Sequence, residues 1–536
     1  MMKRVIATAA MCMVSATALA QHEDHGGGPL SAEQVGTVDF QTSCSPALKT
    51  DFNRAVALLH SFWFPEARRD FAAIAAKDPA CAMAHWGVAL TYWGNPFGGL
   101  RTPQIIADGK AAIAKAQATG TPTRREKGYI DAVAGLFTSD DVTTQRARVV
   151  AYEQTTGQVS KDNPGDVEAR IFWALAVAQT ATPTDKTYAA NLRAAEILEP
   201  LFKKMPSHPG VAHYIIHSYD TPLLAPRALV AARRYASIAP VVPHALHMPS
   251  HTFTRVGAWK ESVETNRKSA EAARKAGGLP GAGEELHALD YQTYAYMQLA
   301  DDAAAKVARD RAVSFEAGAV GGAYAFALAA IPARYALERE AWTEAAALTV
   351  RPAPAAPYTE AITHFARAVG AARGGNPAAA AADIERLTAI QKLLVVTKDP
   401  YWAEQVDIQR QVAVAWKVFA EGDKAKGVEL LSAAADAEDL TDKSAVTPGP
   451  IAPARELLGF MLLDADRAKE AQEAFQKTIT KEPGRFLGLY GGARAAEAAG
   501  NKAGAAALYK QLLEMAGQTT SDRPALAHAK QMASAH

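Results

Sequence analysis

A spacing of 34 residues recurs along the chain and limits its possible folds more than any other feature of the sequence. In the clearest copy, which begins at Ala452, the twentieth position is Ala471, the twenty-fourth is Phe475 and the thirty-second is Pro483. A copy that begins at Leu48 has the same three residue types at the same positions. The alanine lets two helices approach closely, and the proline ends the second helix. The period therefore predicts repeated helix–turn–helix units.

These spacings resemble the tetratricopeptide repeat (TPR), and further copies begin at Pro209 and Pro243. The sequence has no runs of alternating β-branched residues, which would indicate a sheet. We therefore expect an all-α fold, a TPR-like α-solenoid of about nine or ten helical hairpins that pack against their neighbours. The alternative is an irregular all-helical domain with TPR-like spacing by chance. The expected parts are a TPR-like array carrying the histidine cluster at 46–350, degenerate helical repeats at 351–450 and a C-terminal TPR pair at 451–520.

The N-terminus has the pattern of a secretory signal peptide at residues 1–20. Lys3 and Arg4 supply positive charge, a short apolar stretch follows, and Ala18-Leu19-Ala20 resembles a cleavage site. We expect a flexible arm at 21–45 and a periplasmic or secreted protein. The alternative is a mobile N-terminus on a cytosolic protein. No later stretch reaches the ~18 apolar residues that a membrane span needs, so the chain is not expected to cross a membrane.

Charge and cysteine content narrow the possible functions. The 57 Lys and Arg residues nearly equal the 56 Asp and Glu residues. Because a nucleic-acid-binding protein would need a basic excess, we do not expect this chain to bind nucleic acid. Beyond the predicted signal peptide the cysteines are Cys44 and Cys81. An isolated pair in an oxidising compartment predicts a disulfide bond. The alternative is two free buried thiols.

Histidines are concentrated in two successive repeats, with six of the 14 between residues 208 and 251. His213 and His217 hold positions 5 and 9 of the repeat that begins at Pro209. His247 and His251 hold the same positions 34 residues later. Four-residue spacing puts each pair on one face of its helix. Because positions 2, 5 and 9 line the concave groove of TPR domains, the resemblance implies that the four imidazoles converge in one groove.

This four-histidine set predicts a site for a transition-metal ion. Imidazole nitrogens with a nearby carboxylate are the usual ligands of zinc, copper, nickel or iron. His244 and His287 hold position 2 of two repeats, and Asp290 holds position 5 of the second. With Arg255, these three are candidate ligand-binding residues. The alternatives are an anion site and a structural hydrogen-bond ladder between helices.

Four other features of the sequence lead to predictions about local structure. His85 falls in a core-packing position, and His60 falls where it could face the groove but has no evident partner. Pro249 lies inside a predicted helix and should bend or restart it. Residues 439–453 are rich in turn formers and are expected to form a loose joint between repeats.

Several strings resemble those of a family of secreted bacterial TPR proteins. The resemblance covers roughly residues 44–310, and it implies the fold, the compartment and a single site for His213, His217, His247 and His251, but no activity. We expect a periplasmic TPR scaffold that binds a protein, a peptide or a small ligand in a concave groove. The alternative is a metal-binding protein or a metal-dependent enzyme that uses the four histidines. The strings include Cys44-Ser-Pro-Ala, Asn95-Pro96-Phe97, His213-Tyr-Ile-Ile-His217-Ser-Tyr-Asp and, most specific, His247-Met-Pro-Ser-His251.

Overall fold

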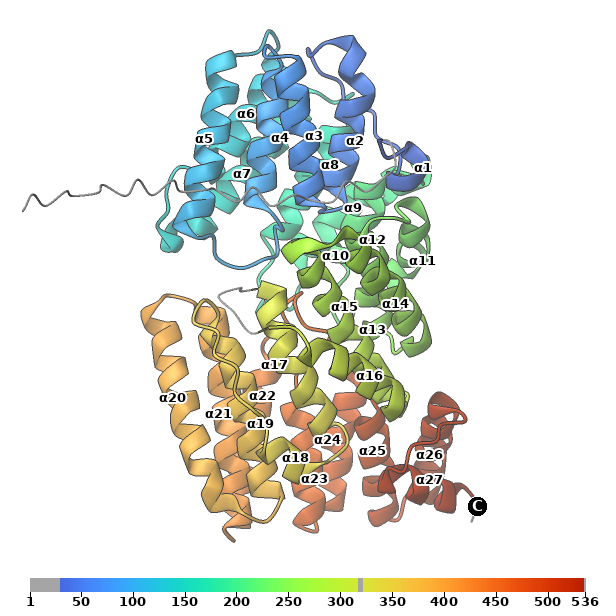
Figure 1. Cartoon of the computed structure of the whole chain (residues 1–536). Coiled ribbons are helices and arrows are strands. Elements are labelled where there is room, and N and C mark those ends of the chain that lie inside the picture. Colours follow the sequence, from blue (N-terminus) through green and yellow to red (C-terminus); the bar gives the residue numbers. More distant parts are fainter. Residues whose placement is uncertain (1–28, 317–321, 535–536) are drawn as a thin grey trace, which may run out of the picture.

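The computed structural model describes residues 29–316 and 322–534, and the regular structure within them is entirely helical (Figure 1). Successive helices pair, and each packs against the helices before and after it. The predicted all-α, TPR-like solenoid is therefore confirmed. Helical pairs also fill residues 82–208, where the sequence shows no clear repeat frame. The signal peptide expected at 1–20 lies outside the described residues.

The first part of the array is coloured blue to cyan in Figure 1. Several of its helices begin at residues whose side chains accept a backbone N–H, as Thr102, Thr123 and Asp166 do. The helices are α1 (Ala32–Val35), α2 (Lys49–His60), α3 (Phe64–Lys77), α4 (Ala82–Trp93), α5 (Pro103–Thr119), α6 (Arg124–Leu136), α7 (Gln145–Asp162), α8 (Val167–Gln179) and α9 (Ala189–Lys204), with 3-10 turns η1 (Pro46–Leu48) and η2 (Val142–Thr144).

The middle of the array carries the histidine-rich repeats. Prolines hold the first turn of three of its helices, where a missing N–H costs nothing. One of them, Pro249, starts a new helix, so the helix restarts as the sequence predicts. The elements are α10 (Pro209–Ser218), η3 (Ala225–Ala228), α11 (Leu229–Ile238), α12 (Pro243–His247), α13 (Pro249–Arg255), α14 (Trp259–Ala276), α15 (Gly278–Gln298) and α16 (Asp302–Val313).

The last part of the array continues the same helical pairing to the C-terminus. No helix within 29–316 and 322–534 is both long enough and apolar enough to span a membrane. The elements are α17 (Gly322–Leu337), α18 (Trp342–Ala346), α19 (Pro357–Arg373), η4 (Pro377–Ala379), α20 (Ala380–Val396), α21 (Pro400–Ala420), α22 (Lys424–Asp439), α23 (Ala454–Asp464), α24 (Ala468–Lys481), α25 (Phe486–Ala498), α26 (Lys502–Ala516) and α27 (Pro524–Ser534).

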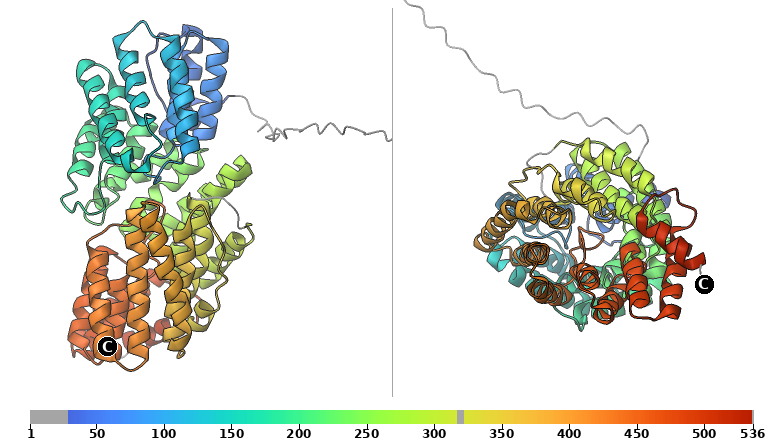
Figure 2. Two further views of the ribbon diagram at one scale, coloured as in Figure 1. Left: turned by 90° about the vertical axis from the view of Figure 1, so that its left-hand side faces the viewer. Right: turned by 90° about the horizontal axis from the view of Figure 1, so that it is seen from below.

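The array curls until its C-terminal hairpins touch its middle, and the end view in Figure 2 shows the helices arranged in a ring. The indole N–H of Trp259, on α14, donates to the carbonyl oxygen of Gly484 at 2.8 Å. A side chain on Gly257 would lie 2.7 Å from the Pro483 carbonyl oxygen, so the two turns meet backbone to backbone. Further along, Arg523 pairs with Asp302. These contacts join segments more than 200 residues apart.

A second link between the middle and the C-terminus is a buried ion-pair network centred on Arg485. Its guanidinium contacts Glu456 at 2.7 Å and Glu338 at 2.8 Å. It also donates to the Tyr294 hydroxyl, on α15, at 2.9 Å. All three charged side chains are almost fully buried, so each charge depends on its partners in the network for compensation.

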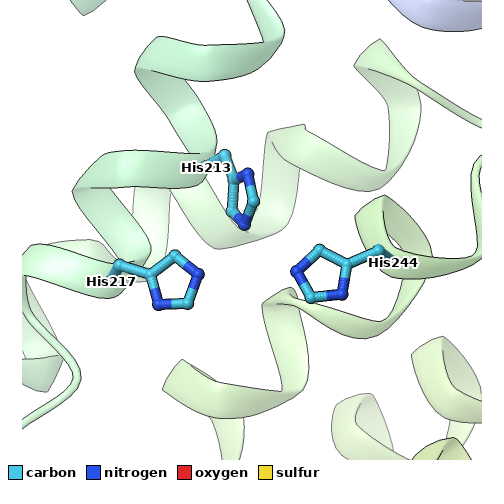
Figure 3. Close-up of side chains that lie close together, drawn as sticks. All are labelled: His213, His217 and His244. Carbon is cyan, nitrogen blue, oxygen red and sulfur yellow. The ribbon is translucent and has the colours of Figure 1, made fainter. Parts of the chain in front are cut away.

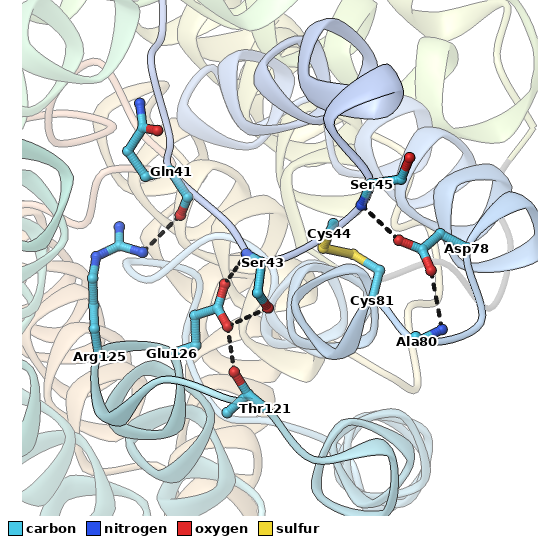
Figure 4. The surroundings of a disulfide bond; sticks show 10 residues. All are labelled: Gln41, Ser43, Cys44, Ser45, Asp78, Ala80, Cys81, Thr121, Arg125 and Glu126. Carbon is cyan, nitrogen blue, oxygen red and sulfur yellow. Dashed lines mark hydrogen bonds between the residues drawn. A yellow bond between two sulfur atoms is a disulfide. The ribbon is translucent and has the colours of Figure 1, made fainter.

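The segment 29–45 differs from the flexible arm that was expected. Phe40 is buried, and its ring lies 5.5 Å from those of Phe52 and Trp86. The backbone N–H of Ser43 donates to Glu126 at 2.5 Å (Figure 4). The buried ring of Phe40 and this backbone hydrogen bond hold the segment against the first hairpins. Residues 21–28 lie outside the described residues.

A disulfide bond joins Cys44 and Cys81, the pairing expected from the two cysteines (Figure 4). The Cα atoms lie 4.7 Å apart, within the range of protein disulfides. Beside the bond, the N–H of Ser45 donates to Asp78 at 2.8 Å. The bond therefore ties the N-terminal segment to the start of α4.

Candidate metal centre

Three imidazoles from α10 and α12 point toward one another, namely those of His213, His217 and His244 (Figure 3). Each ring offers one nitrogen to the space between them, and these three atoms lie within 4.8 Å of one another. All three Nε2 atoms are buried and have no hydrogen-bond partner among the described residues. Because an unpaired buried nitrogen costs free energy, three of them at one place make this a candidate ligand site. We call this set the first trio.

A buried hydrogen-bond network fixes the ring of His213. Its Nδ1 donates to the carbonyl oxygen of His60 at 2.6 Å, so in the neutral ring Nε2 keeps its lone pair. His60, for which the sequence offers no evident partner, donates to Glu168 and accepts from the Tyr214 hydroxyl, both at 2.9 Å. The second oxygen of Glu168 bonds to His208 at 2.9 Å. Since this network is fully paired, we assign it a supporting role.

Two phenylalanines pack on the first trio. The ring centre of Phe62 lies 4.4 Å from that of His213, 5.4 Å from that of His244 and 5.7 Å from that of His217. Phe62 has a φ of 55°, a left-handed conformation that is rare for a bulky residue and is often found at functional sites. Phe97 stacks on His217 with ring centres 4.1 Å apart. The two rings shield the imidazoles from water and hold their orientation.

A second trio consists of His247 on α12, His251 on α13 and His287 on α15. Their ligand atoms also lie within 4.8 Å of one another, and the Nε2 atoms of His247 and His251 are 3.1 Å apart. The Nδ1 atom of His247 donates to the side-chain oxygen of Asn266 at 2.7 Å. The Nδ1 atom of His251 donates to Asp220 at 2.8 Å. Both rings are therefore oriented by groups behind them.

Asp220 is the centre of a buried charge cluster beside the second trio. Arg255 donates to it at 2.9 Å, and the Lys443 ammonium lies 3.4 Å away. Burial alone would raise the pKa of Asp220, but Lys443, Arg255 and His251 hold it well below its usual value. Burial lowers the pKa of Lys443 to about 8, although Asp220 opposes this shift. Arg255 was expected to bind a ligand, and the structure instead commits it to Asp220.

Lys443 reaches this place on the loop 440–453, which was expected to be a loose joint. Arg334, fully buried on α17, donates to two carbonyl oxygens of the loop at 2.7 and 2.8 Å. Arg334 also pairs with Asp290 at 3.1 Å. Asp290 was expected to bind a ligand, but Arg334 from the next repeat holds its carboxylate. Burial raises the pKa of Asp290 to about 6, against the effect of Arg334.

Both trios border a cavity of about 1240 Å³, which is lined by residues of the first and middle parts of the array and by residues between 322 and 446. His213 and His247 are the exceptions: they lie behind the cavity wall and are almost fully buried. Aromatic side chains, Phe62 and Phe97 among them, form part of the same wall. The polar groups of the site that line the cavity are His217, His244, His251, His287, Asp220 and Lys443.

Five of the six imidazoles in the two trios have lowered pKa values, which favours the neutral form that binds metal. Burial, reinforced by neighbouring imidazoles, lowers the pKa of His213 and of His217 well below the usual value. The same causes act on His247 and His287. Burial lowers the pKa of His251 to about 4, although Asp220 opposes the shift. At neutral pH, a metal ion would therefore displace no proton from these rings.

The structure divides the predicted four-histidine site between the two trios. In each trio, the histidines at positions 5 and 9 of one repeat meet the histidine at position 2 of the next repeat. Position 5 of that next helix lies almost one turn beyond position 2, so its histidine belongs to the other trio. The trios remain neighbours, with ring centres 6.0 Å apart for His217 and His251 and 6.2 Å apart for His244 and His247. His213 alone among the predicted four bonds to a backbone carbonyl.

Sequence reasoning missed two charged residues of the site. Asp220 stands three residues after His217, inside a string that resembles the secreted TPR family, so its position carried a signal. Lys443 carried none, because it lies 223 residues away from Asp220 in the chain. Only the path of the loop 440–453 brings it to the centre.

Comparisons with known proteins find no family model and no curated protein that matches the chain. Among solved structures, yeast Tom70 is 9% identical over 90% of this chain and 88% of that chain, with a TM-score of 0.28. The human IFIT1 dimer with PPP-AAAA is 12% identical over 87% and 90%, with a TM-score of 0.33. The P58(IPK) TPR domain is 12% identical over 91% and 99%, with a TM-score of 0.21. At these TM-scores the similarity does not establish a common fold, and the fold assignment rests on the chain's own helices.

Proposed function

We propose that the protein binds a transition-metal ion through His213, His217 and His244, and that the ion holds a small ligand or a peptide segment in the cavity. The proposal rests on the convergence of three buried, unpaired Nε2 atoms. Neutral imidazoles suit zinc, copper, nickel and iron. Three protein ligands leave a tetrahedral ion one position for an outside donor.

The spacing of the first trio suits such an ion. A tetrahedral zinc ion with bonds of about 2.0–2.1 Å holds its ligand nitrogens roughly 3.3 Å apart. The three nitrogens here lie within 4.8 Å of one another. Each ring would therefore move by less than about 1 Å to reach such bond lengths. His213 is braced for this by the carbonyl of His60.

The cavity supports the ligand-binding part of the proposal. Its volume of about 1240 Å³ exceeds the roughly 300–1,000 Å³ of most small-molecule pockets, so a peptide segment also fits. Phe62 and Phe97 offer apolar contacts beside the ion's position. A metal-dependent enzyme is the second candidate, favoured by the open coordination position, where a metal ion can activate water.

We further propose a periplasmic or secreted location. The predicted signal peptide and the disulfide between Cys44 and Cys81 support it, because such bonds persist in oxidising compartments.

The test is a Co²⁺ titration of the purified, chelator-stripped protein, with metal counted per chain after desalting. His217→Ala should reduce the count by one ion relative to the wild type, because it removes a ligand from the first trio. His217 faces the cavity, so its loss should leave the fold intact. His85→Ala, which lies outside both trios, is the matched control and should match the wild type. An unchanged count in the His217 variant would refute the proposal.

A further inference from the structure

We infer that His247, His251 and His287 form a second transition-metal site, adjacent to the first. The inference rests on residues outside the first trio, so it stands or fails separately from the proposed function. With this second site, the two trios together would hold two ions rather than one.

The repeat architecture builds the two trios by one rule. His213 and His217 hold positions 5 and 9 of one repeat, and His247 and His251 hold these positions in the next. Each pair is completed by the position-2 histidine of the following helix, His244 in the first trio and His287 in the second. The second trio is thus a copy of the first, displaced by one repeat along the array.

The geometry between His247 and His251 indicates a cation between them. The Asn266 amide nitrogen donates to the carbonyl of Ser262 at 2.7 Å, so its oxygen faces His247 and accepts from Nδ1. A carboxylate oxygen of Asp220 accepts from Nδ1 of His251. With both Nδ1 atoms protonated, two neutral rings direct the lone pairs of their Nε2 atoms at each other. At 3.1 Å these lone pairs repel, and a metal ion bound by both converts the repulsion into coordination.

The distances and the supporting groups match a metal site. The 3.1 Å between the two Nε2 atoms is close to the roughly 3.3 Å between ligand nitrogens on a tetrahedral zinc ion. The pairing of a carboxylate with the outer nitrogen of a ligating histidine is the usual second layer of such sites. Asp220 supplies it for His251, and Arg255 holds Asp220 from the other side.

The ligand chemistry identifies the class of ion. Three imidazoles favour zinc, copper, nickel or iron over magnesium and calcium, which prefer oxygen ligands. His251 and His287 line the cavity together with His217 and His244 of the first trio. A ligand in the cavity would therefore lie beside both trios, and two bound ions would supply Lewis acidity to its donor group.

The test counts Co²⁺ ions per chain in the chelator-stripped full-length protein, with His287→Ala as the main variant. His287 is half-buried and faces the cavity, so its removal should not unfold the chain. We expect two ions in the wild type and in His85→Ala, one in His287→Ala, one in His217→Ala, and none in the double variant. Asn266→Leu removes the hydrogen bond to Nδ1 of His247. It should weaken the affinity of the second trio for Co²⁺ by about 10–100-fold and leave the affinity of the first trio unchanged.

The outcomes separate the two proposals. One ion in the wild type that persists in His287→Ala and disappears in His217→Ala refutes the second site and leaves the proposed function intact. The reverse pattern refutes the proposed function and supports the second site. Two ions in both the wild type and His287→Ala refute the second trio as the binding site, and no ion in the wild type refutes both proposals.

Discussion

Acidification should unfold the metal-free protein, because its buried histidines cannot take up protons while it is folded. Five rings are almost fully buried with lowered pKa values, those of His60, His213, His217, His247 and His251. In each case the main cause is burial. In the unfolded chain the pKa of histidine is about 6.5. Below that pH the unfolded state binds more protons than the folded state, so stability falls as the pH falls.

The size of the effect follows from the number of rings. A ring such as His251, whose folded pKa is about 4, loses about 1.4 kcal/mol of stability between neutral pH and pH 5.5. The other four rings, whose pKa values are also lowered, add losses of the same sign. Domains are usually stable by only about 5–15 kcal/mol, so this loss should bring the metal-free protein close to unfolding. A bound ion should raise the stability, because the folded chain holds the neutral rings together and the unfolded chain does not.

The assay is urea unfolding of chelator-stripped protein, followed by circular dichroism between pH 8 and pH 5.5. The slope of the unfolding free energy against pH counts the protons taken up, and near pH 5.5 it should correspond to several protons, because His287 and the five buried rings all have lowered pKa values. His217→Gln should lower this number by about one. His85→Gln should lower it by less, because His85 is only partly buried. Uptake near zero would refute the reasoning, since the rings would then be charged in the folded state.

Three further predictions concern stability. Cys81→Ala should cost about 4 kcal/mol, the loop-closure value for a separation of 37 residues, measured by urea unfolding without reductant, with the reduced wild type as control. Gly210→Ala would place a Cβ 2.5 Å from Nδ1 of His60, so it should cost about 1–3 kcal/mol and weaken Co²⁺ binding by moving the carbonyl that holds the first trio. Unchanged Co²⁺ affinity in this variant would contradict that link. Arg485→Met should cost about 3–5 kcal/mol in thermal unfolding, because it leaves two buried carboxylates unpaired, and a loss below about 1 kcal/mol would contradict the burial argument.

Local periodicity allowed the sequence to predict the repeat fold and the positions of the histidines. Proline and alanine at constant spacing define helix ends and helix contacts within one repeat, and these depend on neighbours in the chain. The same frame put His244 and His287 at groove positions. It could not show which histidines meet, because that depends on how far one helix is displaced along the next. The structure groups the four predicted histidines differently, because it divides them between the two trios.

Features that depend on distant contacts could not be predicted. Lys443 reaches Asp220 on a loop whose composition indicates only turns, and Arg334 holds this loop from another repeat. Asp290 sits at a groove position, but the buried guanidinium of Arg334 takes its carboxylate. The N-terminal segment was expected to be flexible because of the polar, glycine-rich stretch 22–28, yet Phe40 gives it a buried anchor.

The contact between Gly257 and Pro483 changes how the array can lose its structure. In an open solenoid the terminal repeats have one neighbour each, so they fray first and repeats can be added or deleted with small effect. Here the last hairpins rest on the middle of the array, so losing them also uncovers α14 and α15. The C-terminal hairpins and the middle of the array therefore stabilise each other. We expect a C-terminal truncation to unfold the histidine-bearing helices as well. Insertion of one extra repeat would separate the C-terminal hairpins from α14. The number of repeats should therefore be as constrained as the histidines of the two trios.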